Sequence, residues 1–253
     1  MTTGTPKGIV HGHGGVLLDH HRLLGLQLDL RPGDRFLWFT TTNWMMCNLV
    51  VSGLLIGATV VLYDGSPTYP EPGRLWDIAA EHRAAVLGVS PGYLLASAKA
   101  GLEPGRDLDL SALRSLGCTG APLPAQPYYW VRDHVGAHVQ VASTSGGTDI
   151  VSTFAGGAPT TPVWAGEISA PVLGVALESW DARGSTAHRT ASVLCNCREI
   201  ARAVARTAGT YAAGSNSGLG ATTDRAATTP APLRTGAAAV VRGFFGSARR
   251  ATA

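Results

Sequence analysis

The order of apolar and polar positions along residues 1–184 alternates between strand and helix patterns. Short, nearly continuous apolar runs predict buried strands, because a strand covered on both faces needs no polar positions. These runs occupy residues 9–11, 36–39, 58–63, 85–89, 116–119, 138–141 and 172–180.

Apolar residues at helical spacing fill the segments between those runs. Leu17, Leu24 and Leu28, for example, share one face of a helix. Strand and helix alternate about five times, which predicts an α/β domain with a mostly parallel sheet flanked by helices. The predicted helices span residues 16–28, 45–56, 75–82, 93–100 and 126–134, and Gly- and Thr-rich loops are expected over 143–166.

The longest stretch without a charged residue, 36–63, raises the question of a membrane span. A spanning helix needs ~20 predominantly apolar residues. Polar residues at 40–43 and two glycines at 53 and 57 interrupt this stretch, and residues 58–63 are rich in β-branched side chains. The pattern therefore predicts a buried helix followed by a central strand, and no membrane partner.

Composition and charge separate a second region from the first. Residues 1–184 carry eleven Lys and Arg against fifteen Asp and Glu, whereas residues 185–253 carry nine Arg, no Lys and two acids. This tail is dominated by Ala, Thr, Gly and Ser, so it is expected to stay mostly disordered. Its composition is typical of GC-rich coding sequence read in a shifted frame. Aromatic residues are scarce among its arginines, so we expect no nucleic-acid partner.

The cysteines and histidines give weak signals. Four cysteines (Cys47, Cys118, Cys195, Cys197) are too few for a disulfide framework, and the N-terminus has no apolar signal region. A reducing cytoplasm is therefore the expected compartment. His11 and His13 would share a face of a strand, but no carboxylate or thiol cluster lies near them in the sequence to complete a metal site.

Four loops fall where an open parallel sheet binds ligands, at the carboxyl ends of its strands: 2–8, 40–43, 117–123 and 143–149. The first combines threonine hydroxyls, glycine amides and Lys7, a set that suits a phosphate, although its spacing is not that of a Walker A loop. A solvated N-terminal loop is the alternative interpretation.

Two further loops carry candidate chemistry. In 143–149, Asp149 offers the carboxylate oxygen that Mg²⁺ prefers, and Thr148 can reach a phosphate oxygen. A turn in which Asp149 caps the next segment is the alternative. In 117–123, small residues let a flat ring lie against the backbone, unless the segment is only a tight turn into the helix at 126.

The order of these loops resembles the adenylate-forming acyl-CoA synthetases and, within that family, the acetoacetyl-CoA synthetase branch. Residues 2–8 resemble the second half of the family's phosphate loop, Ser-Gly-Thr-Thr-Gly-x-Pro-Lys-Gly. Residues 117–123 resemble its adenine-side loop, and 145–149 resemble its motif that ends in Thr and an acid. The segments that resemble the acetoacetyl-CoA branch are 10–15, 38–46 and 62–67, and the whole resemblance covers 2–183.

The resemblance implies part of the large N-terminal domain of a ligase that activates a small carboxylic acid, acetoacetate, with ATP and Mg²⁺ and then transfers it to coenzyme A. By position, Thr148 and Asp149 would be catalytic, with Asp149 also holding Mg²⁺. Trp44, Thr42 and Asn43 would line the acyl side. The expected nucleotide contacts are Thr2, Thr3, Gly4, Lys7, Gly120, Ala121, Pro122, Ser145, Gly146, Gly147 and Thr148.

Departures from the family pattern qualify that expectation. Asn43 stands where the branch has Gly, and Cys47 where it has Trp. The front of the phosphate loop, the ribose-binding Asp and the lysine-bearing lid have no counterpart in the 253 residues. We therefore expect 1–184 to be a partial AMP-binding domain of a truncated ligase that is inactive by itself. A non-catalytic nucleotide- or acyl-binding module is the alternative.

Overall fold

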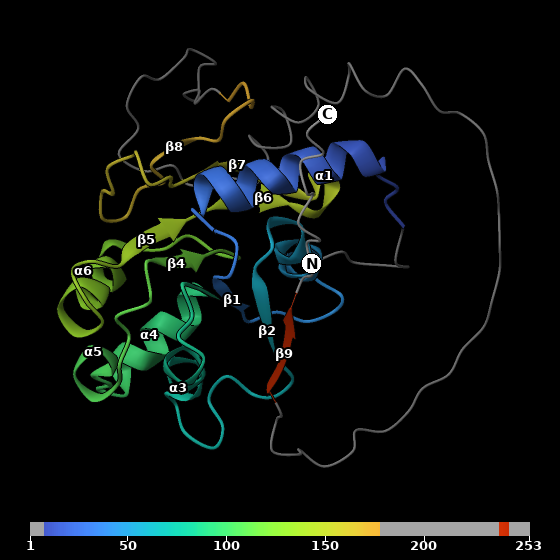
Figure 1. Cartoon of the computed structure of the whole chain (residues 1–253). Coiled ribbons are helices and arrows are strands. Elements are labelled where there is room, and N and C mark those ends of the chain that lie inside the picture. The colour runs from blue at the N-terminus through green and yellow to red at the C-terminus, as the bar shows by residue number, and fades with distance from the viewer. Residues whose placement is uncertain (1–7, 178–237, 243–253) are drawn as a thin grey trace, which may run out of the picture.

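A six-stranded sheet forms the centre of the computed structural model, which describes residues 8–177 and 238–242 (Figure 1). Its strand order is β5-β4-β3-β1-β2-β9; the first five strands are parallel, and β9 pairs antiparallel with β2. The expected α/β fold with a mostly parallel sheet is confirmed. The strands are β1 (Arg35–Trp38), β2 (Thr59–Tyr63), β3 (Val86–Val89), β4 (Ser115–Cys118), β5 (Gln140–Ser143) and β9 (Ala238–Arg242).

Side chains of the parallel strands alternate between two apolar clusters, as the period of a strand requires. Leu37 and Leu87 belong to the cluster on one face, and Phe36 and Val86 to the cluster on the other. All four residues of β3 and of β4 are buried. Burial on both faces explains why these strands appear in the sequence as continuous apolar runs.

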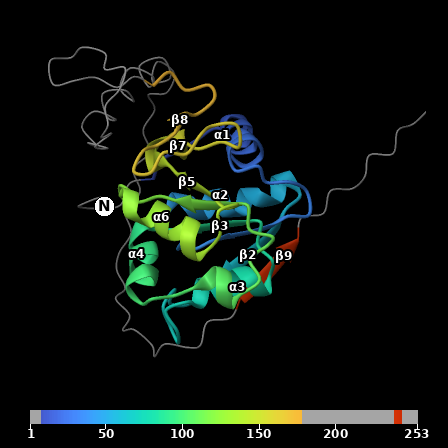
Figure 2. The same cartoon turned by 90° about the vertical axis from the view of Figure 1, so that its left-hand side faces the viewer.

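Helices cover both faces of the sheet (Figure 2). Residues of α3, α4 and α6 pack on one face around Trp76, and residues of α2 and η1 pack on the other. The helical elements are α1 (His13–His21), the π-helical turn η1 (Arg22–Gln27), α2 (Met45–Ser52), η2 (Gly53–Ile56), α3 (Arg74–Glu81), α4 (Pro91–Lys99), α5 (Pro104–Asp107) and α6 (Ala125–His134).

The uncharged stretch at 36–63 forms β1, α2, η2 and β2, as predicted. Within the described residues, no helix is long and apolar enough to cross a membrane.

The connections of β1 and β3 create a switch point in the sheet. From β1 the chain passes through α2 to β2, and from β2 it returns past β1, through α3 on the opposite face, to β3. In open α/β sheets, the connections leave a crevice outside the carboxyl ends of strands at such a point. The topology therefore directs attention to residues that follow β1 and β3.

A second, antiparallel sheet takes up residues 145–156 of the segment 143–166 that we expected to be loops, while 157–166 form no strand or helix, as expected. It consists of β6 (Ser145–Gly147), β7 (Ser152–Gly156) and β8 (Ala170–Pro171), with the short helix η3 (Thr148–Ile150) at the turn of the hairpin. Small polar residues give β6 no strand pattern, but Gly146 has a structural reason. A Cβ there would lie 2.2 Å from the Ser152 carbonyl oxygen, so only glycine lets the hairpin close.

Two predicted strands are wrong. Residues 9–11 form no strand: Val10 is 96% exposed and α1 begins two residues after His11. Of the strand predicted over 172–180, residues 172–177 also form none, because the chain turns at Gly174, which has φ +83; residues 178–180 lie outside the described ranges. Of the tail 185–253, the structure describes only β9, and the expectation of disorder for the other residues lies outside the described ranges.

Candidate functional site

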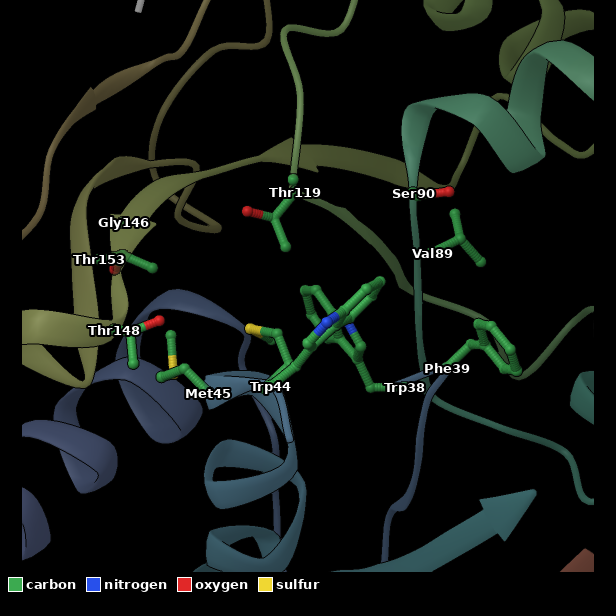
Figure 3. Close-up of a pocket in the computed structure, with 13 residues that line it drawn as sticks. Trp38, Phe39, Trp44, Met45, Val89, Ser90, Thr119, Gly146, Thr148 and Thr153 are labelled. Atoms are coloured by element: carbon green, nitrogen blue, oxygen red, sulfur yellow. The ribbon is translucent and has the colours of Figure 1, made fainter. Parts of the chain in front are cut away.

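A cavity of about 190 Å³ opens at the switch point, where β1, β3 and β4 end (Figure 3). Its volume is below the ~300 Å³ at which typical small-molecule sites begin. One side is apolar and the other is built from small polar residues. The lining residues are Trp38, Phe39, Trp44, Met45, Met46, Val89, Ser90, Thr119, Gly120, Gly146, Gly147, Thr148 and Thr153.

The indole of Trp38 lies against two glycines of neighbouring strands. A Cβ on Gly88 would come within 1.8 Å of Trp38 Cδ2, and one on Gly117 within 2.4 Å of Cζ3. The side chain is only 5% exposed, so the ring is fixed by packing. Trp44, at the start of α2, is 57% exposed and supplies a second indole to the cavity (Figure 3).

The polar side comes from β6, η3 and the ends of β3 and β4. Ser90 and Thr119 are engaged in the protein: Ser90 Oγ accepts the Tyr93 N–H at 3.3 Å and caps α4, and Thr119 Oγ1 donates to the Thr144 carbonyl at 3.1 Å. Thr148 is exposed and makes no side-chain hydrogen bond within the described ranges. Its hydroxyl is therefore available to a ligand at the rim.

Asp149 lies beside this rim but does not line the cavity. Its exposed carboxylate has neither an ion-pair nor a hydrogen-bond partner among residues 8–177. The same residues contain no cluster of three or more His, Cys, Asp or Glu side chains that could hold a metal. A lone carboxylate fits Mg²⁺, which is commonly bound by one or two carboxylates together with substrate phosphates.

The other predicted contacts divide into three groups. Gly120 lines the cavity, whereas the adjacent Ala121 and Pro122 are exposed and do not. Thr42 and Asn43 are also exposed and outside the lining, so only Trp44 of the predicted acyl-side residues reaches the cavity. Thr2, Thr3, Gly4 and Lys7 lie outside the described residues, and Ser145 is in β6 but not in the lining.

Most residues that line the cavity were not predicted from the sequence as site residues. Phe39 and Ser90 follow β1 and β3 directly, so the switch point would have identified them once the strand order was known. Thr153 comes from β7, which was not predicted as a strand. Thr119 falls in the predicted loop 117–123, and the missed lining residues are Trp38, Phe39, Met45, Met46, Val89, Ser90 and Thr153.

Two other kinds of site can be assessed from the same region. Burial raises the pKa of the Cys118 thiol to about 12, so at neutral pH it is protonated and is no thiolate nucleophile. His13 starts α1, so it does not share a strand face with His11. His20 uses both ring nitrogens on protein oxygens and has none left for a metal.

An open parallel sheet with a pocket at its switch point defines a ligand-binding α/β domain. The profile of the family described as "AMP-binding enzyme" matches residues 2–188, and the chain belongs to that family.

Known relatives are similar over the same region. The chain is 49% identical over 183 residues to an acetoacetyl-coenzyme A synthetase of Rhizobium meliloti (strain 1021) and 42% identical over 183 residues to an acetoacetyl-CoA synthetase of Gallus gallus. These alignments cover 72% of this chain but 28% and 27% of the relatives. The solved acetoacetyl-CoA synthetase from Streptomyces lividans is 51% identical with a TM-score of 0.69, over 74% of this chain and 29% of that one.

Proposed function

We propose that this chain is the acyl- and α-phosphate-binding part of an AMP-forming acyl-CoA ligase that acts on acetoacetate. One observation supports this most: the small apolar cavity and the glycine-rich hairpin carrying Thr148 and Asp149 meet at one switch point. The names of the relatives supply acetoacetate as the acid.

The apolar side would hold the acyl chain. Trp38 and Trp44 line this side, and a volume of about 190 Å³ favours short acids over long ones. Thr42 and Asn43 would act on the acyl side only through the loop that leads to Trp44, because neither lines the cavity.

The hairpin would hold the nucleotide at its α-phosphate. Gly146 and Gly147 let the backbone approach the ligand closely, and the Thr148 hydroxyl, which has no partner among residues 8–177, can donate to an α-phosphate oxygen. Asp149 would hold Mg²⁺, which neutralises phosphate charge when bound. Gly120 with Ala121 and Pro122 would lie beside the adenine, and Thr2, Thr3, Gly4 and Lys7 would cradle the outer phosphates.

The reaction has two steps. A carboxylate oxygen of the acid attacks the α-phosphorus of ATP, the bond to the β-phosphate breaks, and pyrophosphate leaves. The thiol of coenzyme A then attacks the acyl carbonyl and AMP leaves. Catalysis of this kind depends mainly on positioning and on neutralising charge, for which the cavity and the hairpin provide two fixed surfaces.

The 253 residues alone should bind an adenylate without turning over. The chain spans 28% of the length of its Rhizobium relative. Residues 185–253 contain no lysine that could stabilise a developing negative charge, and lack of one such donor costs ~10²–10³ in rate. The cytoplasm is the expected compartment, since ATP and coenzyme A are available there and Cys47 and Cys118 are free thiols.

A calorimetric titration with a non-hydrolysable acetoacetyl-adenylate analogue tests the proposal. We expect saturable binding that Thr148→Val and Trp44→Ala each weaken about tenfold. We expect the 253-residue chain to release no pyrophosphate when acetoacetate is added. A version extended to the length of its relatives is the positive control and should release it. Binding with no release from either version would favour the non-catalytic binding module. Absence of binding, or release within tenfold of the extended version, would contradict the proposal.

A further inference from the structure

His20 is a fully buried polar side chain that joins three segments distant in sequence. It lies in α1 with 0% of its surface exposed. Its Nδ1 is 2.7 Å from Ser52 Oγ in α2, and its Nε2 is 2.8 Å from the Val151 carbonyl oxygen next to η3. The ring therefore spans from the helical layer to the turn that carries Thr148 and Asp149.

The partners determine how the ring protons are arranged. A carbonyl oxygen can only accept, so Nε2 carries a proton and donates it to Val151. In that tautomer of the neutral ring, Nδ1 accepts from the Ser52 hydroxyl. Both ring nitrogens are thus satisfied by the protein, as burial requires.

Val151 is held in an unfavourable backbone conformation. Its φ is 50 and ψ 32, the left-handed region that a β-branched residue rarely adopts. Such a conformation persists only where surrounding contacts over-determine it, and it is common near functional sites. Val151 directly follows η3, so its conformation sets the direction in which Thr148 and Asp149 are presented.

Two polar side chains of η1 contact the chain just after Val151, at the two ends of β7. Arg22 Nη2 donates to Ser152 Oγ at 3.2 Å, and Gln27 Nε2 donates to the Gly157 carbonyl at 3.3 Å. Of these three links, only that of His20 is made to the strained residue itself. The other two act on Ser152, the first residue of β7, and on Gly157, directly after its last residue.

We infer that His20 is a positioning residue: through its Nε2–H bond it holds Val151 in the left-handed conformation and so fixes the turn that presents Thr148 and Asp149. The inference rests on the proposed function for what that turn binds. The hydrogen bond and the strain can be tested without any ligand.

Two isosteric variants separate the two bonds of the ring. The amide of Gln occupies the position of Nε2 and can still donate to Val151, whereas the amide of Asn occupies the position of Nδ1 and keeps only the Ser52 link. Hydrogen exchange of the full 253-residue chain measures amide protection over 146–153. We expect His20→Asn to increase exchange there about tenfold and His20→Gln about twofold or less.

A remote variant controls for general destabilisation. On the opposite face of the sheet, Trp76 Nε1 donates a buried hydrogen bond to Ser97 Oγ at 3.1 Å, and Ser97→Ala removes it. It should lower overall stability comparably and leave exchange at 146–153 unchanged relative to the rest of the chain.

The double variant His20→Asn with Val151→Gly completes the test. Glycine adopts the left-handed region without strain, so protection at 146–153 should recover at least in part. If the single variant His20→Asn does not fold, recovery of folding in the double variant supports the inference in the same way. Equal effects of Gln and Asn, or no recovery with Val151→Gly, would overturn the inference. If the unmodified chain does not bind the adenylate analogue, only the proposed function is contradicted.

Discussion

The parallel sheet and the β6–β7 hairpin supply opposite sides of one cavity, but they are held in different ways. The sheet is buried on both faces in apolar clusters. The hairpin contains two glycines in β6 and is tied to α1 and η1 by polar contacts from His20 and Arg22, and Gln27 contacts Gly157 directly after it. It also carries the strained Val151.

The apolar burial of the sheet and the polar contacts of the hairpin have different consequences, the first for folding and the second for ligand binding. Apolar burial is non-directional and stabilises in proportion to area, whereas each hydrogen bond contributes only ~1 kcal/mol but fixes a direction. We therefore expect the sheet to determine whether the chain folds, and the hairpin to determine whether it binds. Functional segments are commonly drawn from the less stable parts of a fold.

The largest expected effect is on the sheet side, at Trp76. It is fully buried, its ring packs in tilted contacts with Tyr93 and Trp130, and it donates to Ser97 Oγ. Trp76→Ala should lower the free energy of unfolding by ~3–5 kcal/mol in urea titrations. The matched change Trp164→Ala, at a 64% exposed residue, should stay within about 0.5 kcal/mol. Similar losses at the two positions would mean that the sheet core does not dominate stability.

The next effect compares two adjacent glycines of the hairpin. A Cβ at Gly146 would lie 2.2 Å from the Ser152 carbonyl oxygen, while one at Gly147 would meet nothing closer than 3.9 Å. Gly146→Ala should therefore cost ~1–3 kcal/mol and open the hairpin, as measured by hydrogen exchange. Gly147→Ala should leave the hairpin closed. Equal increases in hydrogen exchange for the two variants would contradict the close approach of Gly146 to the Ser152 carbonyl.

The carboxylate of Asp149 should matter to binding rather than to folding. Asp149→Asn keeps the size but removes the anionic oxygen, so affinity for ATP should fall about tenfold in the presence of Mg²⁺ and little in its absence. Asp109→Asn, at an exposed carboxylate before β4 at the opposite end of the sheet, is the control. Equal losses with and without Mg²⁺ would assign Asp149 to the turn instead.

The smallest effect concerns Cys118 on the sheet side. Burial raises its pKa from 9.0 to about 12, so the folded chain keeps a proton that the unfolded chain loses above pH 9. The stability that this thiol contributes is present below pH 9 and should fall by about 1 kcal/mol between pH 9 and 10. Cys118→Ala should flatten this part of a stability–pH curve, and an unchanged slope would contradict the burial.

The sequence predicted the sheet better than the site for a physical reason. Apolar periodicity reports burial, and all residues of β3 and β4 are buried, so their pattern was sufficient to predict them. The hairpin is built from Ser, Gly and Thr, whose positions depend on contacts 130 residues away, such as that of Arg22 with Ser152. Ser90 and Trp38 could be placed in the site only after the strand order had defined the switch point.

Hydrogen exchange with and without the acetoacetyl-adenylate analogue tests the central claim most directly, that the sheet and the hairpin bind one ligand together. At millimolar analogue, amides in 38–46 and in 145–153 should become protected at the same ligand concentration, because both segments line the cavity. Amides in α3 and α5, on the other side of the sheet, should not change. Protection of only one of the two segments, or of neither, would contradict the claim.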